Sequence, residues 1–547
     1  MATPRVNIGA GLPGLLKDGS QHFTGVEGVI IKNIDACGEL GALTRTSLGP
    51  NGMNKLIQNH LDKIFVTSDA ATIMNEMEVV HPAAKMIVLA SKMQEAEFGD
   101  GSNFVCTFAT ELLHRARAMV VMGLHPSEIV TGYKKAAKAA EELLPQLVCG
   151  EIANVRQVDD VSRYISSAVG SKFLDYEPVL SKLVSEACEH VLSSTSNANP
   201  GLSMDSVRIC KMPGGSVHQS TIVKGLLLQR APMGTQREKQ KAGIAVFGAN
   251  LEASQTETKG TVLINNADEL LGYTGSEEDK LEEQIRGIRD SGVDVIVSGG
   301  SVSEMALHFC EKYNLLVLKS TSKFELRRIC NVTGAFPSAR LGPLSPDEVG
   351  HCDLVVAREI GGQLCTIFEQ HGEESKVATI VLRSSTRSQL EDLERACDDG
   401  IHTVKTMCQD KRFLPGAGAC EIELALRIAQ LGEESTGLEQ YPILRFAEAL
   451  EVIPRTLSEN CGLEPNQVIS KLYAAHKAGK VNCGVDIDHD NTGNQVVDDV
   501  AGSKNIYDAF ANKLSALRLA SDVAITILTI DQLIMSKAAG GPALPRQ

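Results

Sequence analysis

The stretch GVDVIVSGGSVSEMALHFCEKYNLLVLKS (Gly292–Ser320) decides what kind of fold the middle of this chain adopts. Its two aliphatic runs are short and unbroken, as in strands that are buried on both faces of a sheet. The stretch between them has the length and period of a helix. A strand-like run, AGIAVFGAN (residues 242–250), precedes it, and a helix-like run, KFELRRICNVTG (residues 323–334), follows it. This alternation predicts an α/β layer with parallel strands.

The sequence before this layer is typical of helices. HPAAKMIVLASKMQEAEF (residues 81–98) has apolar residues at i, i+3, i+4 and i+7, which predicts one apolar helix face. That face comprises Met86, Leu89, Ala90 and Met93. NFVCTFATELLHRARAMVVMG places Phe104, Phe108 and Leu112 at four-residue steps, and a third helix is expected to begin near Pro126.

The sequence after the layer becomes helical again. A polar stretch, EQHGEESK, precedes the strand-like run VATIVLRSS, and a long acidic helix is expected over residues 387–407. The last third is helical up to DVAITILTIDQLI. Two arrangements fit this order: three successive domains, or an α/β unit inserted into one helical domain built from both chain ends. At roughly 150 residues per domain, 547 residues suggest three or four domains.

Composition excludes several classes of protein. Lys+Arg 53 against Asp+Glu 68 gives a net charge of −15, which argues against a general nucleic-acid binder and against docking on anionic membrane. We expect no secretion signal and no membrane span, because no apolar run has the required form. The 14 cysteines show no CxxC spacing, so we expect reduced, cytosolic thiols in cores rather than zinc sites or disulfides. Trp is absent and aromatics are 4%, so the cores must be aliphatic.

A first loop with the composition of an anion site is TSLGPNGMNK. Gly49, Pro50 and Gly52 predict a tight turn before a helix from Met53, and backbone N–H groups at such a turn can bind anions. The loop is not a Walker A motif, and by itself it is more typical of an ordinary turn.

A second candidate, FVTSDAATIM, places Asp69 between a strand-like run (Ile64–Thr67) and a helix-like stretch. An aspartate at such a junction is often a helix N-cap, and a catalytic role is the alternative.

The third candidate is FGDGSNF. Gly99 and Gly101 would let the backbone approach a ligand, and Ser102 and Asn103 can cap the following helix. Asp100 could then hold a hard cation such as Mg²⁺ beside a phosphate. The alternative is a surface Gly-Asp-Gly turn.

Two further segments are weaker. ERACDDG carries Asp398 and Asp399 on an acidic helix, where such pairs are usually solvated. LPGAGACEIELALRIAQL is a glycine-rich turn that opens a helix, but it lacks the third glycine of a dinucleotide fingerprint.

The order of these motifs resembles that of the group II chaperonins, which include the eukaryotic cytosolic chaperonin. The resemblance runs through nearly the whole chain. It rests on TSLGPNGMNK, VTSDAATI, HPAAKM, GDGSN, ETKGTVLI, HCDLV, TIVLRSST, LERACDDG, PGAGACEIELA, FAEALEVIPRTLSENCGL, GVDID and ILTIDQLIMSK. DAATI and GDGSNF, where most members have DGATI and GDGT, resemble one particular subunit type of that complex.

The resemblance implies a multi-domain α + α/β fold and selects the insertion arrangement. A mostly helical equatorial ATPase domain would come from both chain ends, with an intermediate domain and an inserted α/β apical domain that binds substrate. The implied boundaries are 1–150 and 406–547 (equatorial), 151–218 and 373–405 (intermediate), and 219–372 (apical).

The resemblance also implies a site for ATP and Mg²⁺. Asp100 would hold the metal, and Asp69 and Asp399 would position or deprotonate the attacking water. Phosphoryl transfer needs charge neutralisation and an oriented nucleophile, which suits three separate carboxylates. The nucleotide contacts would be Leu48, Gly49, Pro50, Gly101, Ser102, Asn103, Gly416, Gly484 and Asp508.

Four positions depart from the family pattern. Ala417 replaces the middle glycine of a GGG turn, Ala70 replaces a glycine, Asn103 replaces a hydroxyl residue, and Gly400 replaces an alanine. Because the carboxylates are kept, we expect ATP binding and some hydrolysis.

Client binding is implied for the apical part. A helical protrusion is expected within residues 263–283, and SKFELRRIC would supply a groove helix with Phe324, Leu326, Arg327 and Arg328. Packing of Phe324 and Leu326 into the apical core is the alternative.

The leading hypothesis is an ATP-driven folding subunit of a cytosolic, hetero-oligomeric double ring with paralogous partners and unfolded clients, actin- and tubulin-like by family. The second hypothesis is a structural ring member that binds nucleotide with little hydrolysis of its own. A metabolic nucleotide-dependent enzyme is a third reading, disfavoured because no GxGxxG follows VDVIVSGG.

Overall fold

The structure is a computed structural model, and it describes residues 21–24, 26–59, 61–193, 201–252, 267–370, 377–487 and 495–535. The chain divides into two compact units. Unit 1 combines Met1–Glu151 with Arg412–Gln547, and unit 2 is Ile152–Lys411. The middle of the chain is therefore inserted into a unit that both ends build. The finer division of unit 2 into intermediate and apical parts stays a prediction.

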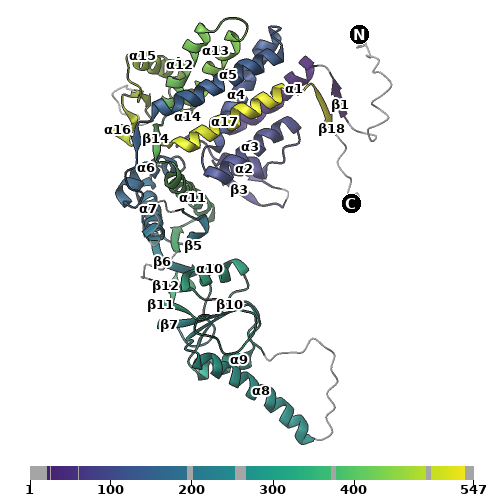
Figure 1. Cartoon of the computed structure of the whole chain (residues 1–547), viewed down its shortest axis with the longest axis vertical. Coiled ribbons are helices and arrows are strands. Elements are labelled where there is room, and N and C mark those ends of the chain that lie inside the picture. The colour runs from purple at the N-terminus through teal and green to yellow at the C-terminus, as the bar shows by residue number, and fades with distance from the viewer. Residues whose placement is uncertain are drawn as a thin grey trace. The chain divides into compact units, whose positions relative to one another are not determined.

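Unit 1 is mostly helical (Figure 1). Its helices are α1 (Val26–Arg45), α2 (Ala70–Glu76), α3 (Pro82–Phe98), α4 (Ser102–Val121), α5 (Pro126–Leu143), α12 (Ala419–Glu434), α13 (Gln440–Leu450), α14 (Val452–Asn460), α15 (Pro465–Lys477), α16 (Val500–Lys504) and α17 (Phe510–Leu528). Its short strands are β1 (Gln21–Thr24), β2 (Lys55–Gln58), β3 (Ile64–Thr67), β4 (Gly150–Glu151), β14 (Arg412–Pro415), β15 (Gly484–Val485), β16 (Val496–Val497), β17 (Tyr507–Ala509) and β18 (Gln532–Met535).

Helix α4 lies at the centre of unit 1. It packs against α1, α3, α13 and α17, so its neighbours come from both ends of the chain. Figure 1 shows the yellow α17 beside the purple and blue helices of the N-terminal part. The expected core positions Phe104, Phe108 and Leu112 are buried, and Phe108 meets Phe446 of α13 edge to face, with ring centroids 5.5 Å apart.

The apolar face predicted for the helix over residues 81–98 is wrong for Leu89 and Met93, whereas Ala90 is buried and Met86 packs partly against the core. Leu89 and Met93 are 59% and 56% exposed. The face that packs inward carries alanines, two β-branched aliphatic residues and two polar residues: Ala83, Ala84, Ile87, Val88, Ala90, Ser91 and Gln94. The prediction followed the spacing of the large apolar side chains. In the structure, α4 and α17 pack against α3, whose buried residues are mostly alanine or β-branched.

Unit 2 combines helices with a large sheet. Its helices are α6 (Val158–Gly170), α7 (Glu177–Ser193), α8 (Ala267–Asp290), α9 (Glu304–Lys312), α10 (Lys323–Thr333) and α11 (Arg387–Gln409). Its strands are β5 (Val207–Pro213), β6 (Thr221–Leu228), β7 (Glu238–Phe247), β8 (Val295–Ser298), β9 (Leu316–Lys319), β10 (Pro337–Ser338), β11 (Gly350–Ile360), β12 (Gln363–Glu369) and β13 (Ala378–Ser384).

The sheet of unit 2 is mixed. Its order is β5-β13-β6-β12-β11-β7-β8-β9, with β10 beside β7. The parallel prediction is confirmed for β7, β8 and β9, but β11 and β12 form an antiparallel hairpin. Gly361 and Gly362 both have positive φ (61° and 79°), which the two-residue turn of such a hairpin requires.

Both faces of the β7–β8–β9 region are covered by helices. Val295 and Val297 belong to the cluster that includes Ile329 of α10. Ile296, between them, belongs to the cluster with Ile285 of α8 and Phe309 of α9. This alternation explains why the strands are unbroken aliphatic runs. All 14 cysteines are free, and none is in the exposed class. Among the described helices, none has the length and apolarity needed to cross a bilayer.

Candidate functional site

The loop after α1 is a turn held from the other end of the chain. Gly52 N–H donates to the Gly49 carbonyl (3.0 Å), and Gly49 has a φ of 84°, a conformation that favours glycine. From α14, the Asn460 amide nitrogen donates to the Leu48 carbonyl at 2.8 Å. The helix predicted from Met53 is wrong, because the chain continues instead into strand β2. The turn itself is present as predicted, and Pro50 lies within it.

The Asp100 loop joins α3 to α4 through two left-handed residues. Gly99 (φ 73°) is the C-cap of α3, and Gly101 (φ 84°) is the N-cap of α4. A Cβ would be strained at both positions. The carboxylate of Asp100 accepts the Gly101 N–H at 2.6 Å and so lies at the start of α4. Ser102, which opens that helix, is buried.

This arrangement can hold a metal only together with other ligands. Within the described ranges, no three His, Cys, Asp or Glu side chains are grouped as metal ligands. An ion at Asp100 would therefore take most of its oxygens from phosphates and water, which is the usual mode for Mg²⁺. The N-terminus of α4, with its unpaired N–H groups, is a favourable place for the phosphates. The donor set fits a Mg²⁺–nucleotide complex.

The helix-capping role predicted for Ser102 and Asn103 is wrong. Gly101 is the N-cap, and no side chain caps the helix there. The Asn103 amide nitrogen instead donates to the Ser47 hydroxyl at 3.2 Å and to the Thr44 carbonyl at 3.4 Å. Asn103 thus ties the Asp100 loop to the turn after α1.

The C-terminal part of unit 1 contributes a second group of predicted residues. A Cβ on Gly416 would lie 3.4 Å from Asp508 Oδ1 and 2.9 Å from Ile506 Cγ2. A Cβ on Gly484 would lie 3.0 Å from the Ala417 carbonyl oxygen. Strand β14, which ends just before Gly416, pairs with the strand of Asp508. Gly416, Gly484 and Asp508 therefore gather around one glycine-rich turn.

Ala417 has a strained backbone in this turn. Its φ is 53°, in the left-handed region where a Cβ is unfavourable. A glycine at this position, as in the family pattern, would adopt the same conformation without strain.

Sequence reasoning missed Lys513, on α17. Its Nζ lies 2.8 Å from Asp508 Oδ2 and 2.5 Å from Glu421 Oε1, and 4.7 Å from the centroid of the Phe104 ring. Burial lowers the pKa of the Lys513 ammonium group, but Asp508 and Glu421 outweigh this effect and the net pKa is raised. Nothing in the local sequence marks a lysine on an apolar helix as the partner of two distant carboxylates.

The predicted nucleotide contacts of unit 1 are linked into one neighbourhood. Asn103 joins the first turn to the Asp100 loop. Asn512 Oδ1 lies 2.9 Å from where a Cβ on Gly101 would be, which joins that loop to α17. Lys513, the next residue, then reaches Asp508 and the glycine-rich turn. Loops from both chain ends therefore surround the start of α4.

Asp69 is the N-cap of α2. Its Oδ2 accepts from Thr72 N–H at 3.0 Å and from the Thr72 hydroxyl at 2.7 Å. The capping interpretation is therefore confirmed, and a catalytic role stays a prediction. The strand (β3) and the helix expected on either side of Asp69 are both present.

Asp399 belongs to unit 2. It is 6% exposed on α11, and Lys172, just after α6, lies 2.7 Å from its Oδ2. The interpretation of a solvated acidic pair is wrong for this residue. Its neighbour Asp398 has its pKa raised to about 6, chiefly by burial and then by Glu394. A Cβ on Gly400 would lie 3.1 Å from a Val169 methyl, so the departure from alanine relieves crowding against α6.

The four predicted client-binding residues of α10 divide into two kinds. Phe324 is 74% exposed and Arg327 is exposed as well. Leu326 packs partly against the core of the sheet, and Arg328 is half-buried beside Asp205, 3.8 Å away. Packing in the core is thus wrong for Phe324 and right for Leu326. The protrusion predicted within 263–283 falls partly outside the described residues, which resume at 267 with α8.

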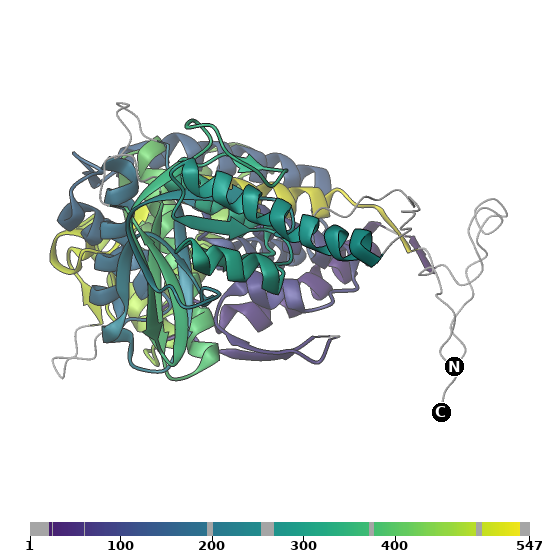
Figure 2. The same ribbon diagram turned by 90° about the horizontal axis from the view of Figure 1, so that it is seen from below.

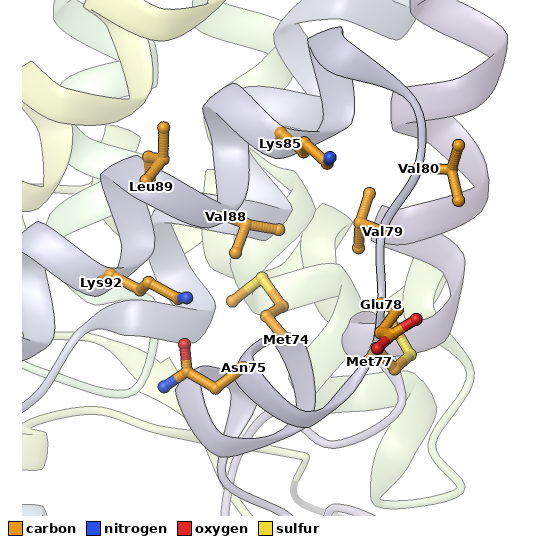
Figure 3. Close-up of a pocket in the computed structure, with 10 residues that line it drawn as sticks. All are labelled: Met74, Asn75, Met77, Glu78, Val79, Val80, Lys85, Val88, Leu89 and Lys92. Carbon is orange, nitrogen blue, oxygen red and sulfur yellow. The ribbon is translucent and has the colours of Figure 1, made fainter. Parts of the chain in front are cut away.

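A cavity of about 460 Å³ lies elsewhere in unit 1, between α2, α3 and their connection (Figure 3). Its lining is mostly apolar and contains none of the predicted nucleotide residues. The residues are Met74, Asn75, Met77, Glu78, Val79, Val80, Lys85, Val88, Leu89 and Lys92. The candidate nucleotide site therefore rests on the loops and their bonds, not on this cavity.

Comparison with known proteins gives matches over nearly the whole chain. A family model described as TCP-1/cpn60 chaperonin family matches residues 40–538. T-complex protein 1 subunit theta of Dictyostelium discoideum is 46% identical over 536 residues, which is 98% of both chains. The proteins of the same name from Arabidopsis thaliana (47% over 535 residues) and Homo sapiens (45% over 535 residues) cover 97% and 98% of this chain and 96% of their own length.

Proposed function

Because the chain belongs to the TCP-1/cpn60 chaperonin family, we propose that it is an ATP-hydrolysing subunit of a cytosolic chaperonin double ring. The ring would be hetero-oligomeric, built with paralogous subunits, and would enclose and fold non-native proteins. The relatives named subunit theta support the assembly with other subunits. The observation that carries the proposal is the meeting of loops from both chain ends around the start of α4.

The nucleotide would bind in unit 1. Asp100 would hold Mg²⁺, which when bound neutralises phosphate charge. The first turn of α4, with Gly101, Ser102 and Asn103, would receive the phosphates. The remaining contacts would come from Leu48, Gly49, Pro50, Gly416, Gly484 and Asp508. Their support is the set of bonds that connects these loops.

Hydrolysis would use two further carboxylates. We propose that Asp69 and Asp399 orient the attacking water and accept its proton. Asp69 already accepts two hydrogen bonds at its Oδ2, which fixes the direction of its carboxylate. Asp399 is held by Lys172, whose Nζ lies 2.7 Å from its Oδ2.

Assembly is supported by an exposed apolar surface. The β2–β3 hairpin projects from the helices of unit 1 (Figure 2) and carries apolar side chains that are between 64% and 74% exposed. They are Met53, Leu56, Leu61 and Ile64. A monomer rarely leaves such a two-stranded apolar ribbon uncovered. We propose that a neighbouring subunit covers it.

Client binding would use the outward face of α10. Phe324 offers an exposed apolar ring and Arg327 a positive charge, a combination suited to unfolded chains with apolar and acidic segments. Leu326, which packs partly against the core of the sheet, and Arg328, which lies beside Asp205, would anchor this face. Actin- and tubulin-like clients are the expectation from the family.

The test is to change Asp69→Ala or Asp399→Ala in this subunit alone and to measure ATP hydrolysis and client folding by the assembled ring. We expect both to fall, whereas the exposed control Asp347→Ala should leave them unchanged. The native mass of the endogenous protein tests assembly separately, and a monomer would contradict it.

A second candidate function is a structural ring member that binds nucleotide with little hydrolysis. Two observations favour it: Ala417 is strained in the glycine-rich turn, and the Asn103 side chain is engaged with Ser47 and Thr44. Unchanged ring ATPase and unchanged folding in both aspartate variants, with nucleotide still bound, would select this function.

A further inference from the structure

Two buried polar side chains of α3 donate hydrogen bonds to backbone carbonyls of the Asp100 loop. Gln94 is 0% exposed and Ser91 is 1% exposed. The Gln94 amide nitrogen donates to the Asp100 carbonyl at 3.1 Å, and the Ser91 hydroxyl donates to the Ser102 carbonyl at 3.1 Å. The carbonyls on both sides of Gly101 are therefore bound by one helix.

The same amide also binds α17. Gln94 Nε2 donates to the backbone carbonyl of Asn512 (3.3 Å) and to its side-chain oxygen (2.5 Å). Gln94 Oε1 accepts from the Ser515 hydroxyl at 2.9 Å. Within the part of the chain that the structure describes, the bonds of this amide thus lead either to the Asp100 loop or to α17, the helix that carries Lys513.

Packing alone does not call for these residues. The inner face of α3 is otherwise made of Ala, Ile and Val, and an apolar residue of similar size would fill the place of Gln94. A buried amide is favourable only when its bonding groups are all satisfied. Here one bond goes to the Asp100 carbonyl in the loop that would hold Mg²⁺ and the others go to Asn512 and Ser515 of α17, which points to a role in holding that loop against α17.

We propose that Gln94, assisted by Ser91, is a positioning residue for the Mg²⁺–nucleotide complex; this rests on the proposed function. By fixing the Asp100 and Ser102 carbonyls, the pair sets where the Asp100 carboxylate and the Gly101 N–H point. By binding Asn512, Gln94 holds this loop in register with α17 and hence with Lys513 and Asp508.

Loss of the Gln94 amide should weaken Mg²⁺-dependent nucleotide binding more than metal-free nucleotide binding. Without the Gln94 amide, Asp100 keeps its charge but loses its fixed orientation, so the benefit that Mg²⁺ brings to nucleotide binding should fall. Supporting groups behind metal ligands typically contribute about 10- to 100-fold to metal affinity. Nucleotide binding without metal, which does not use Asp100 as a ligand, should change much less.

The experiment is to measure Kd for ADP on the full chain by calorimetry, with Mg²⁺ and with EDTA, for the wild type and Gln94→Met. We expect the ratio of the two Kd values to shrink about ten-fold or more in Gln94→Met. Ser521→Ala is the matched control, because Ser521 is buried on α17 and has no hydrogen-bond partner within the described residues. Its ratio should equal that of the wild type.

The outcomes separate the two proposals. A wild type that does not bind ADP, or binds it equally with and without Mg²⁺, contradicts the proposed function itself. A wild type with a Mg²⁺ effect that Gln94→Met retains in full overturns the positioning role. Equal weakening of both Kd values in Gln94→Met also overturns it, because a general loss of structure has no preference for metal.

A milder variant, Ser91→Ala, tests the proposal if Gln94→Met does not fold. Ser91→Ala removes one hydroxyl and leaves the Gln94 bonds in place. We expect its Kd ratio to shrink about three-fold, consistent with the loss of a single neutral hydrogen bond. An unchanged ratio in Ser91→Ala would remove Ser91 from the proposal, and an unchanged ratio in both variants would end it.

Discussion

Two lysine–aspartate pairs, one in each unit, hold carboxylates that the family resemblance assigns to the ATPase site. In unit 1, Lys513 binds Asp508 and also the buried Glu421. In unit 2, Lys172 binds Asp399. The lysine of unit 1 is shared by two carboxylates, one of them buried.

The pairs differ in exposure and in their surroundings. The Asp508 side chain is 36% exposed and that of Asp399 only 9%. Asp508 can therefore contact a ligand while Lys513 holds it from the protein side. Asp399 is enclosed. Its neighbour Asp398 is also largely buried, and burial, followed by the charge of Glu394, raises the pKa of Asp398 to about 6. Unit 1 therefore pairs its lysine with a partly exposed aspartate, while unit 2 contains a largely buried carboxyl, Asp398, that changes protonation near pH 6.

The largest effect should come from Lys513→Met. The variant leaves Glu421 and Asp508 facing each other without a cation, and Glu421 Oε2 already has no hydrogen-bond partner within the described residues. Removing one partner of a buried ion pair destabilises a protein by about 3–5 kcal/mol. We expect a loss of this size in the free energy of unfolding of unit 1, measured by urea denaturation.

The control for this variant is Lys471→Met, since Lys471 is exposed and donates to the neutral Gln495 amide oxygen at 3.2 Å. It should change stability by less than about 0.5 kcal/mol. If Lys513→Met were as mild as this control, the shared-lysine account of unit 1 would be wrong.

A smaller effect, of opposite sign, should follow from Asp398→Asn. The folded-state pKa of Asp398 is raised to about 6, so the folded chain keeps a proton that the unfolded chain releases. Stability therefore falls as pH rises from about 4 to about 6, by at most about 3 kcal/mol. The amide removes this penalty, and we expect Asp398→Asn to be more stable than the wild type by about 2 kcal/mol at pH 8 and nearly equal to it at pH 4.

The pH dependence is the decisive part of that measurement. Thermal unfolding of both proteins at the two pH values gives the difference directly, and Asp347→Asn, at an exposed position of unit 2, should show no gain at either pH. A gain for Asp398→Asn that is the same at pH 4 and pH 8 would show that something other than its ionisation is responsible.

The comparison of the two pairs also shows what sequence could predict. Local sequence patterns predict strands β7, β8 and β9, helices α4 and α5, and the position of Asp69 at a strand-to-helix junction. They do so because hydrophobic period and helix capping are local properties. The unbroken aliphatic runs predicted these strands correctly, because helices cover both faces of the strands.

The errors have a common physical cause. Lys513 and Gln94 are polar residues whose partners lie elsewhere in the chain, at Glu421 and at Asp100 and Asn512. Periodicity assigns such residues to the outside of a helix, and for α3 it placed Leu89 and Met93 on the inner face, although both are exposed. Only tertiary pairing shows that the polar Gln94 and Ser91 belong on the inner face, among Ala, Ile and Val.

The smallest effect should come from Ala417→Gly, in the turn beside Asp508. Ala417 has a φ of 53°, and glycine adopts that conformation without strain, so the variant should be more stable by about 0.5–1 kcal/mol despite the greater freedom of its unfolded chain. Ala419→Gly, two residues further in the first turn of α12, is the matched control and should lose about 1 kcal/mol or more, because glycine weakens a helix and leaves a gap at a buried position. Chemical denaturation of the two variants measures both signs. A loss of stability in Ala417→Gly would mean that its methyl group, which lies near Gly484, contributes more through packing than its backbone loses through strain.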